Sequence, residues 1–237
     1  MTTLYTKLAD LYHEMYQSIF DYHAQFRTAH AIFKARSARR VLELACGAGN
    51  LAPWFEAAGY HYTGMDAASS MLAIARREHP TTRFLRADMR RFTVRGKFDA
   101  ALIVGRSFAY MTRNEDVLST LRCIRRSLRP RGVLVFDNFD ARTIFADLSH
   151  PVRDIVRVGD KTISRVSTRT ASLRTGWTWN WTATYVVEER SRRRTFRDRS
   201  VLRAFTRDEL TLFLTLAGFT TVRIRKRGAV LLTVAQA

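Results

Sequence analysis

The sequence has few of the residues that build disulfide frameworks, cysteine-based metal sites and membrane spans. Its 237 residues include only two cysteines, so we expect a reducing, cytoplasmic location. The longest apolar runs, such as "VLVF" and "AVLL", fall far short of the roughly 18 residues that a membrane span needs. The opening "MTTLYTKLADLYHEMY" lacks a basic start followed by an apolar block, so no signal peptide is expected.

Lysine is also scarce, and arginine supplies nearly all of the positive charge. Only five of the 40 basic residues are lysine, and against 21 acidic residues the formal net charge is +19. Guanidinium groups suit phosphates, which makes nucleic acid or a nucleotide-linked substrate a candidate partner. Net charge bears on non-specific partners rather than on function, however, and arginines spread over solvated faces give the same number.

Strand and helix patterns alternate between residue 39 and about residue 140. Apolar β-rich runs such as "RVLELA" and "YHYTGMD" predict strands, while "NLAPWFEAA" and "SSMLAIARREHP" predict helices that end at a glycine and before a proline. The apolar spacing in "NEDVLSTLRCIRRSL" predicts another helix, and "VLVFDNF" is a strand after the turn "RPRG". This alternation indicates βαβ units and a parallel sheet.

The pattern changes outside this region. Residues 152–204 alternate with a period of two, which predicts an antiparallel meander of three or four strands. "TRDELTLFLTLAG" predicts a helix with a capping box of Thr206 and Glu209, followed by a final strand pair joined through Gly228. The first 36 residues read as helix, with four tyrosines among charged residues.

The stretch "VLELACGAGN", residues 41–50, breaks an apolar run with two glycines separated by one residue. With Ala52 in the third place it satisfies G-x-G-x-x-[G/A], and Asp66 ends the next predicted strand, so a nicotinamide-dependent enzyme is allowed. Three features argue against that class. Glu43 lies inside the strand before the loop, a long helical segment precedes it, and "YMTRN" is not a Tyr-x-x-x-Lys pair for hydride transfer.

The same stretch resembles the first motif of the class I S-adenosylmethionine-dependent methyltransferases. Further segments are similar to later motifs of that family in the same order: "GMDAASSMLAIAR", "RADMRRF", "FDAALIVGRSFAYM", "LRPRGVLVFDNFD" and the closing "AGFTTVRI" with "VLLTVAQ". The resemblance implies an α/β fold with a Rossmann-like doubly wound seven-stranded sheet and a reversed last strand. It divides the chain into an N-terminal helical lid at 1–36, a methyltransferase core at 37–140 and 205–237, and an antiparallel β insertion after strand five, at 141–204, that covers the active site.

The resemblance also implies S-adenosylmethionine as the cofactor and assigns roles to its motifs. Gly47 and Gly49 lack Cβ atoms and so let the cofactor approach the backbone. Asp66 accepts hydrogen bonds from both ribose hydroxyls, and Asp88 accepts one from the adenine amino group. Glu43 binds the cofactor's ammonium, through water. The other implied cofactor contacts are Tyr12, Tyr22, Ala45, Ala67, Met71, Met89 and Val104.

One branch of the family is most similar, the small-molecule N-methyltransferases that include enzymes dimethylating nucleotide-linked deoxyamino sugars. "LADLYHEMYQSIFDY" and "VLRAFTRDELTLFLTLAGF" carry this resemblance. It implies direct in-line methyl transfer to a small-molecule acceptor, an amine, and it makes the N-terminal tyrosines, Tyr16 among them, contacts of cofactor and substrate. The choice between one methyl group and two stays open, and a homodimer is allowed.

Tyr110 stands where the sugar enzymes often carry a histidine. Asp137 and Asn138 resemble the Asp-Asn pair of metal-dependent O-methyltransferases, but Gly105 and Arg106 replace the aspartate that those enzymes need after strand four, so no metal is expected. The candidate catalytic residues are Tyr110, Asn138 and Tyr12, and further candidates for the base or for substrate binding are His13 and His150.

Methylation of RNA or another nucleic acid is the alternative function. Residues 189–207 carry eight arginines, and Trp177, Trp179 and Trp181 are positioned to stack on bases. Against this, the tryptophans share one face of a predicted strand, which favours packing, and no Asn/Asp-Pro-Pro-aromatic motif follows strand four. A non-enzymatic scaffold would not need the intact glycines and acidic residues. The sequence therefore predicts a methyltransferase that acts on a small molecule.

Overall fold

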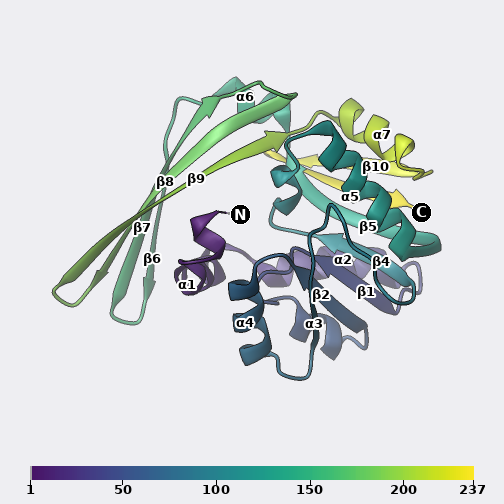
Figure 1. Ribbon diagram of the computed structural model, residues 1–237, viewed down its shortest axis with the longest axis horizontal. Coiled ribbons are helices and arrows are strands. Elements are labelled where there is room, and N and C mark those ends of the chain that lie inside the picture. The colour runs from purple at the N-terminus through teal and green to yellow at the C-terminus, as the bar shows by residue number, and fades with distance from the viewer. Residues whose placement is uncertain (1) are drawn as a thin grey trace.

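A seven-stranded sheet forms the centre of the molecule in the computed structural model, which describes residues 2–237 (Figure 1). The strand order is β10-β11-β5-β4-β1-β2-β3, in which β1 to β5 pair in parallel and β11 runs antiparallel to both of its neighbours. The strands are β1 (Arg40–Leu44), β2 (His61–Asp66), β3 (Arg83–Arg86), β4 (Phe98–Ile103), β5 (Leu128–Phe139), β10 (Val222–Arg227) and β11 (Val230–Gln236). The predicted doubly wound sheet with a reversed last strand is confirmed.

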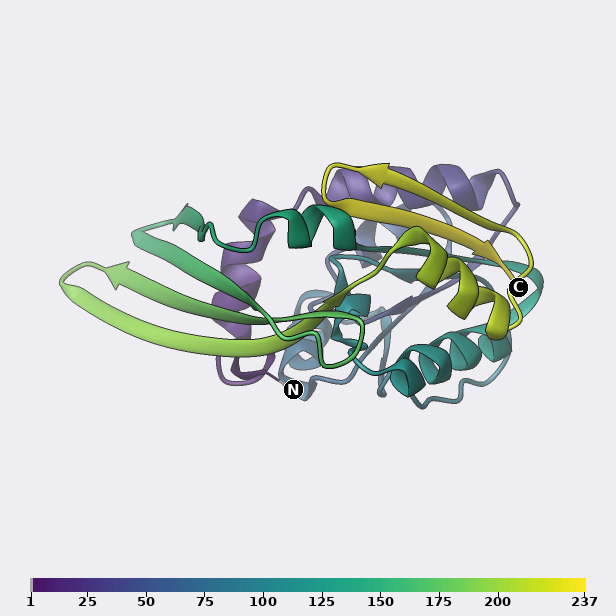
Figure 2. The same ribbon diagram turned by 90° about the horizontal axis from the view of Figure 1, so that it is seen from above.

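Helices cover both faces of this sheet, as the two views show (Figures 1 and 2). One face is covered by α2 (Tyr22–Lys34), α3 (Ala52–Ala57) and α4 (Ser69–Glu78), and the other by α5 (Asn114–Ser127) and α7 (Arg207–Leu216). Because side chains alternate along a strand, Val41 packs on the first of these faces and Leu42 on the second. Both faces are buried, which explains why the parallel strands read as continuous apolar runs.

A second, four-stranded sheet extends away from the first (Figure 2). It consists of β6 (Val152–Val158), β7 (Lys161–Ala171), β8 (Trp177–Glu189) and β9 (Arg192–Ala204), all antiparallel. Its inner face packs on two N-terminal helices, η1 (Thr3–Tyr5) and α1 (Ala9–Ile19), through Met15, Ile163 and Tyr185 among others. The predicted meander is confirmed, and the division into lid, core and insertion remains our interpretation.

Two tryptophans of β8 contact neighbouring aromatic rings, but only Trp179 is buried. Trp179 is 2% exposed, and its ring lies 5.2 Å from that of Phe139 in an edge-to-face contact. Trp177 makes a similar contact with Phe145, at 5.2 Å between ring centroids. The packing expected from their shared strand face is confirmed for Trp179, whereas Trp177 keeps 37% of its surface exposed beside Phe145.

The N-terminal region differs in detail from the single helix predicted there. Its first residue, Met1, lies outside the described residues. The chain between 3 and 34 forms three helices, because Phe20 adopts an extended conformation after α1 and the Asp21 side chain then accepts a hydrogen bond from Ala24 N, which begins α2. A short helix that the sequence did not reveal, α6 (Ala141–Ala146), is capped in the same way by Asp140.

The predicted capping box at the start of α7 is confirmed. Thr206 Oγ1 accepts from Glu209 N at 3.2 Å, and Glu209 Oε2 accepts from Thr206 N at 3.0 Å. The other oxygen of Glu209 lies 3.1 Å from a guanidinium nitrogen of Arg203, a side chain only 2% exposed that also donates to Asn114 Oδ1 at 2.7 Å. This buried arginine therefore joins β9 to α5 and α7.

We expect Glu209→Gln to lower the free energy of unfolding by about 2–3 kcal/mol, because Arg203 would keep its charge in a buried place without a charged partner. The amide oxygen still accepts from Thr206, so the cap survives. Urea denaturation followed by circular dichroism measures the change. Asp208→Asn, in the same turn but exposed, is the control and should cost about 0.5 kcal/mol. Equal losses in the two variants would contradict this account.

Candidate functional site

The loop between β1 and α3 turns sharply, with positive φ at Ala45 (54°), Gly47 (56°) and Gly49 (76°). Asp66, at the end of β2, holds this turn. Its Oδ2 accepts from Gly47 N at 2.9 Å, and its Oδ1 accepts from Ala68 N at 2.7 Å, just before α4. Each oxygen keeps a second lone pair, so the carboxylate can accept two more hydrogen bonds side by side.

The two glycines of the loop have different roles. A Cβ at Gly47 would lie 3.4 Å from the Met71 methyl, which is ordinary contact, whereas a Cβ at Gly49 would lie 2.7 Å from the Phe84 ring. Gly49 is therefore required by packing beneath the loop, while Gly47 lines the cavity above it. Of the two glycines only Gly47 borders the cavity, and its role in making room for a ligand stays a prediction.

A cavity of about 470 Å³ lies above this loop, which we call the glycine-loop cavity. The structure brings eight of the predicted site residues together on its lining, namely Tyr12, Ala45, Gly47, Asp66, Ala67, Asp88, Met89 and Tyr110. The sequence reasoning missed several other lining residues, including Tyr5, Arg90, Ser107 and Ser200.

Other predicted residues lie outside this lining. Glu43 is buried in the sheet and accepts a hydrogen bond from the Tyr62 hydroxyl at 2.6 Å; burial raises its pKa to about 8, although this hydrogen bond lowers it. Tyr22 is half-buried, and the burial of its hydroxyl raises its pKa to about 12. Val104 packs against the core and lines a separate small cavity, and Asn138 is fully buried in β5.

The two histidine candidates are also remote from the cavity. His13 is buried between α1 and α4, where its Nε2 lies 2.9 Å from Glu78 and 3.0 Å from Gln17. His150 is exposed and contacts Asp147. Neither histidine lines the glycine-loop cavity, so the structure gives them no direct part in a reaction there.

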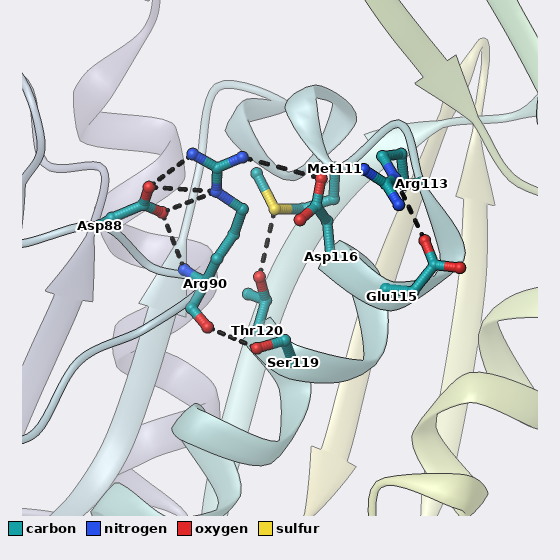
Figure 3. A network of polar contacts seen from close by, with 8 residues as sticks. All are labelled: Asp88, Arg90, Met111, Arg113, Glu115, Asp116, Ser119 and Thr120. Carbon is teal, nitrogen blue, oxygen red and sulfur yellow. Dashed lines mark hydrogen bonds and ion pairs between the residues drawn. The ribbon is translucent and has the colours of Figure 1, made fainter.

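Asp88, just after β3, is held by an arginine two residues away (Figure 3). The Arg90 guanidinium donates to both carboxylate oxygens at 2.6–3.0 Å, and Arg90 N adds a bond of 2.9 Å. Another guanidinium nitrogen of Arg90 lies 3.7 Å from Asp116 of α5. These hydrogen bonds lower the pKa of Asp88, so it is an ionised acceptor at neutral pH. The Asp-x-Arg spacing is the signal that could have revealed Arg90.

A second cavity of about 360 Å³, the sheet cavity, lies between α1, the loop after β4 and the inner face of the four-stranded sheet. Tyr5, Tyr12 and Tyr110 line both cavities. The Tyr5 and Tyr110 hydroxyls are 3.0 Å apart, and the Tyr5 and Tyr12 rings lie 4.9 Å apart. Two ligands, one in each cavity, would therefore meet at these three tyrosines.

The tyrosines between the cavities are neutral hydroxyl groups. Burial raises the pKa of Tyr5 and Tyr12 well above its usual range, and it raises the pKa of Tyr110 to about 12. They can orient a ligand by hydrogen bonding, and their rings exclude water, but they hold their protons at neutral pH.

Three arginines line the sheet cavity. Arg165 pairs with Asp154 at 2.5 Å and also donates to the Tyr16 hydroxyl. Arg169 donates to the backbone carbonyl of His150 at 3.3 Å, and its buried Nε has no partner among the described residues. The third is Arg106, in the loop after β4. Guanidinium groups that leave hydrogen-bond donors available in a cavity are suited to phosphate or carboxylate oxygens.

Comparison with known proteins places this site in a family. Residues 41–132 match a family described as a methyltransferase domain. A relative from Saccharopolyspora spinosa, dTDP-4-amino-2,3,4,6-tetradeoxy-D-glucose N,N-dimethyltransferase, is 30% identical over 181 residues, which cover 76% of this chain and 71% of the relative. The chain belongs to the S-adenosylmethionine-dependent methyltransferases. The chain spans only 49% of another relative, YqeM of Bacillus subtilis, to which it is 34% identical over 122 residues.

Solved structures of methyltransferases share the architecture over nearly the whole chain. DesVI of Streptomyces venezuelae superposes with a TM-score of 0.86 at 26% identity, covering 96% of this chain and 97% of that one. CalS10, described as an amino pentose methyltransferase from Micromonospora echinaspora with S-adenosylmethionine bound, gives 0.79 at 25% identity, with the same coverage. Such coverage includes β6 to β9, so the four-stranded sheet is part of the shared fold.

S-adenosylmethionine is thus the cofactor of this methyltransferase, as predicted, and the glycine-loop cavity fits it. Asp66 presents two acceptor oxygens, which suit adjacent hydroxyls, and the ionised Asp88 suits an amino group. Among residues 2–237, no three His, Cys, Asp or Glu side chains are grouped as a metal site, and no helix is long and apolar enough to cross a membrane.

We expect Asp66→Asn to weaken the binding of S-adenosylhomocysteine by about 10- to 100-fold, because the amide loses charge and presents a donor where the carboxylate accepts. Isothermal titration calorimetry measures the affinity. The control, Asp160→Asn, changes an exposed aspartate that contacts only Arg190 across a hairpin. An unchanged affinity in a folded Asp66→Asn protein would show that the carboxylate does not bind the cofactor.

The buried Glu43 makes stability depend on pH. Its folded-state pKa is raised to about 8, so the stability it contributes is fully present below its unfolded pKa, near 4.3, and is lost as pH rises through about 8. The loss approaches about 1.4 kcal/mol per pH unit within that window. Urea unfolding at pH 5 and pH 8, without cofactor, should show a smaller difference in Glu43→Gln than in the wild type. Identical pH dependence would contradict this assignment.

Proposed function

We propose that this methyltransferase transfers a methyl group to the amine of a nucleotide-linked amino sugar bound in the sheet cavity. The observation that carries the proposal is the junction of the two cavities at Tyr5, Tyr12 and Tyr110. Among the described residues these three tyrosines alone line both cavities, so an acceptor beneath the four-stranded sheet would lie next to a cofactor above the glycine loop there. The similarity to the Saccharopolyspora dimethyltransferase and to DesVI supports this acceptor class.

The cofactor contacts follow from the hydrogen-bonding groups of the glycine-loop cavity. Asp66 accepts from the two ribose hydroxyls, Asp88 accepts from the adenine amino group, and Met89 provides an apolar surface beside the ring. Once bound, S-adenosylmethionine supplies a methyl group already activated for transfer by its sulfonium. The protein's own task is alignment and the exclusion of water, which the tyrosine rings perform at the junction.

The far end of the sheet cavity suits the phosphates of the acceptor. Arg165 and Arg169 lie on β7 with side chains lining the cavity, and neither lines the glycine-loop cavity. Phosphates bound there place the sugar between the arginines and the tyrosine junction. Trp179 and Trp181, which line the same cavity, give the sugar and base apolar surfaces.

The features that suggested nucleic acid are largely used in packing and ion pairing. Arg203, one of the eight arginines in 189–207, is buried and pairs with Glu209, while Arg193 and Arg194 lie within 3.6 Å of Glu188 and Glu189. Trp179 is buried. We therefore favour the small-molecule acceptor. A cytoplasmic location stays a prediction, a homodimer stays allowed, and the choice between one methyl group and two stays open.

We expect label from radioactive S-adenosylmethionine to appear in a dTDP-linked 3-amino or 4-amino deoxysugar. Arg169→Met should raise KM for this acceptor by about 10-fold, because a charge-assisted hydrogen bond to phosphate is lost, and should leave KM for S-adenosylmethionine unchanged. Chromatography of the labelled products provides the measurement.

The matched control is Arg157→Met, an exposed arginine on β6 that does not line the cavity. Two results would contradict the proposal. One is transfer of label to RNA in preference to the nucleotide sugars, and the other is an equal KM for the amino sugar with and without its nucleotide.

A further inference from the structure

The sheet cavity contains more positive than negative charge. Its described lining residues include three arginines and a single carboxylate, Asp154, which is already paired with Arg165 at 2.5 Å. No histidine, glutamate or lysine belongs to that described lining. The cavity therefore lacks an ordinary side-chain base and has an excess of guanidinium charge.

Of the three arginines that line the sheet cavity, Arg106 is the one whose neighbours in sequence line both cavities. Its neighbour Gly105 lines the sheet cavity, and its other neighbour, Ser107, lines the glycine-loop cavity. Arg106 itself is in the left-handed region, with φ 60° and ψ 25°. This conformation is held by a hydrogen bond of 2.7 Å from Arg106 N to Asp137 Oδ1.

The Arg106 side chain is held by two aromatic rings rather than by an anion. Its guanidinium carbon lies 5.1 Å from the centroid of Phe20, at the end of α1, and 5.3 Å from that of Phe139, at the end of β5. Within the described residues it makes no ion pair. Its charge is therefore fixed in place and remains available to act on whatever occupies the cavity.

A positive charge at this place affects the chemistry of an amine. Attack on a methyl group needs the nitrogen lone pair, which an ammonium lacks. A positive charge about 6 Å from an ammonium, at an effective dielectric constant of about 20, lowers the pKa of that ammonium by about two units. An ammonium beside Arg106 is thus driven to release its proton.

We propose that the positive charge of Arg106 keeps the acceptor amine neutral at the junction. Arg106 does so through its electrostatic effect on the amine, and it takes the place of a side-chain base. The inference rests on the proposed function, because it requires an amine acceptor. The ammonium releases one proton to water on binding. The nitrogen lone pair then forms the N–C bond as the C–S bond breaks, and that bond's electron pair stays on sulfur. The methylated ammonium again loses its proton to water, which permits a second transfer.

The groups that act on this amine come from every element around the cavity. They are Tyr5 of η1, Tyr12 and Tyr16 of α1, Tyr110 of η2, Asp137 of β5, Asp154 of β6, and Arg165 and Arg169 of β7. The tyrosines are neutral, and Asp154 pairs with Arg165. Asp137 bonds the backbone of Arg106 rather than its guanidinium. These groups together carry a net positive charge before the acceptor binds, and once its phosphates are held by Arg165 and Arg169 the charge of Arg106 is the one left beside the amine.

Proton release on binding tests this directly. A dTDP-linked amino deoxysugar is titrated calorimetrically into protein saturated with S-adenosylhomocysteine, at pH 7, in two buffers of different ionisation enthalpy. We expect about one proton to be released by the wild type and by Arg106→Lys, and about half or less by Arg106→Met. No release by the wild type, or equal release by Arg106→Met, would overturn the inference.

Two controls separate this inference from the function on which it rests. Arg169→Met removes an equal charge from the same cavity, but at the residue that we assign to the phosphates, so it should weaken binding and leave the proton count unchanged. The corresponding dTDP-linked hydroxy sugar has no amine and should bind without release. If neither sugar binds, the proposed acceptor is wrong and the inference fails with it; if both bind and no proton is released, the inference alone is wrong.

Discussion

The hydrogen bonds between the Asp66 carboxylate and the backbone on either side of it determine the geometry on which the site depends. The loop after β1 contains Ala45 and Gly47 at positive φ, a conformation that residues with a Cβ adopt only at some cost. Gly47 N donates to one oxygen of Asp66 and Ala68 N to the other. The loop, the end of β2 and the start of α4 are thereby joined, and the remaining lone pairs are left for a ligand.

The four-stranded sheet encloses a second cavity, which adjoins the glycine-loop cavity of the Rossmann-like core. Its inner face and α1 enclose the sheet cavity, and three tyrosines separate that cavity from the glycine loop. Arginines from distant parts of the chain, Arg106 after β4 and Arg165 and Arg169 on β7, meet there. Our proposal therefore assigns a different ligand to each cavity: the carboxylates of the glycine-loop cavity suit the nucleoside of the cofactor, and the arginines of the sheet cavity suit an anionic acceptor.

The sequence predicted the features that depend on local patterns. The structure confirms the alternation of strands and helices, the meander at 152–204 and the capping box of α7. It also confirms that one carboxylate stands at the end of β2 and another just after β3. What it missed depends on contacts across the fold. The break at Phe20, the clash that forbids a Cβ at Gly49 and the burial of Asn138 all require knowledge of neighbours that spacing does not supply. The clamp of Arg90 on Asp88 was also missed, although its Asp-x-Arg spacing could have revealed it. The placement of Arg106 on the same cavity as the β7 arginines likewise depends on the whole fold.

The central claim is that cofactor and acceptor occupy adjoining cavities on either side of the tyrosine junction. A crystal structure with S-adenosylhomocysteine and dTDP tests this claim most directly. The account predicts the homocysteine sulfur beside Tyr12 and Tyr110, and the diphosphate in the sheet cavity against Arg165 and Arg169. A dTDP molecule bound elsewhere, for example in the open groove of about 770 Å³ that Arg86 and Arg126 line beyond Asp88, with the sheet cavity empty, would contradict it.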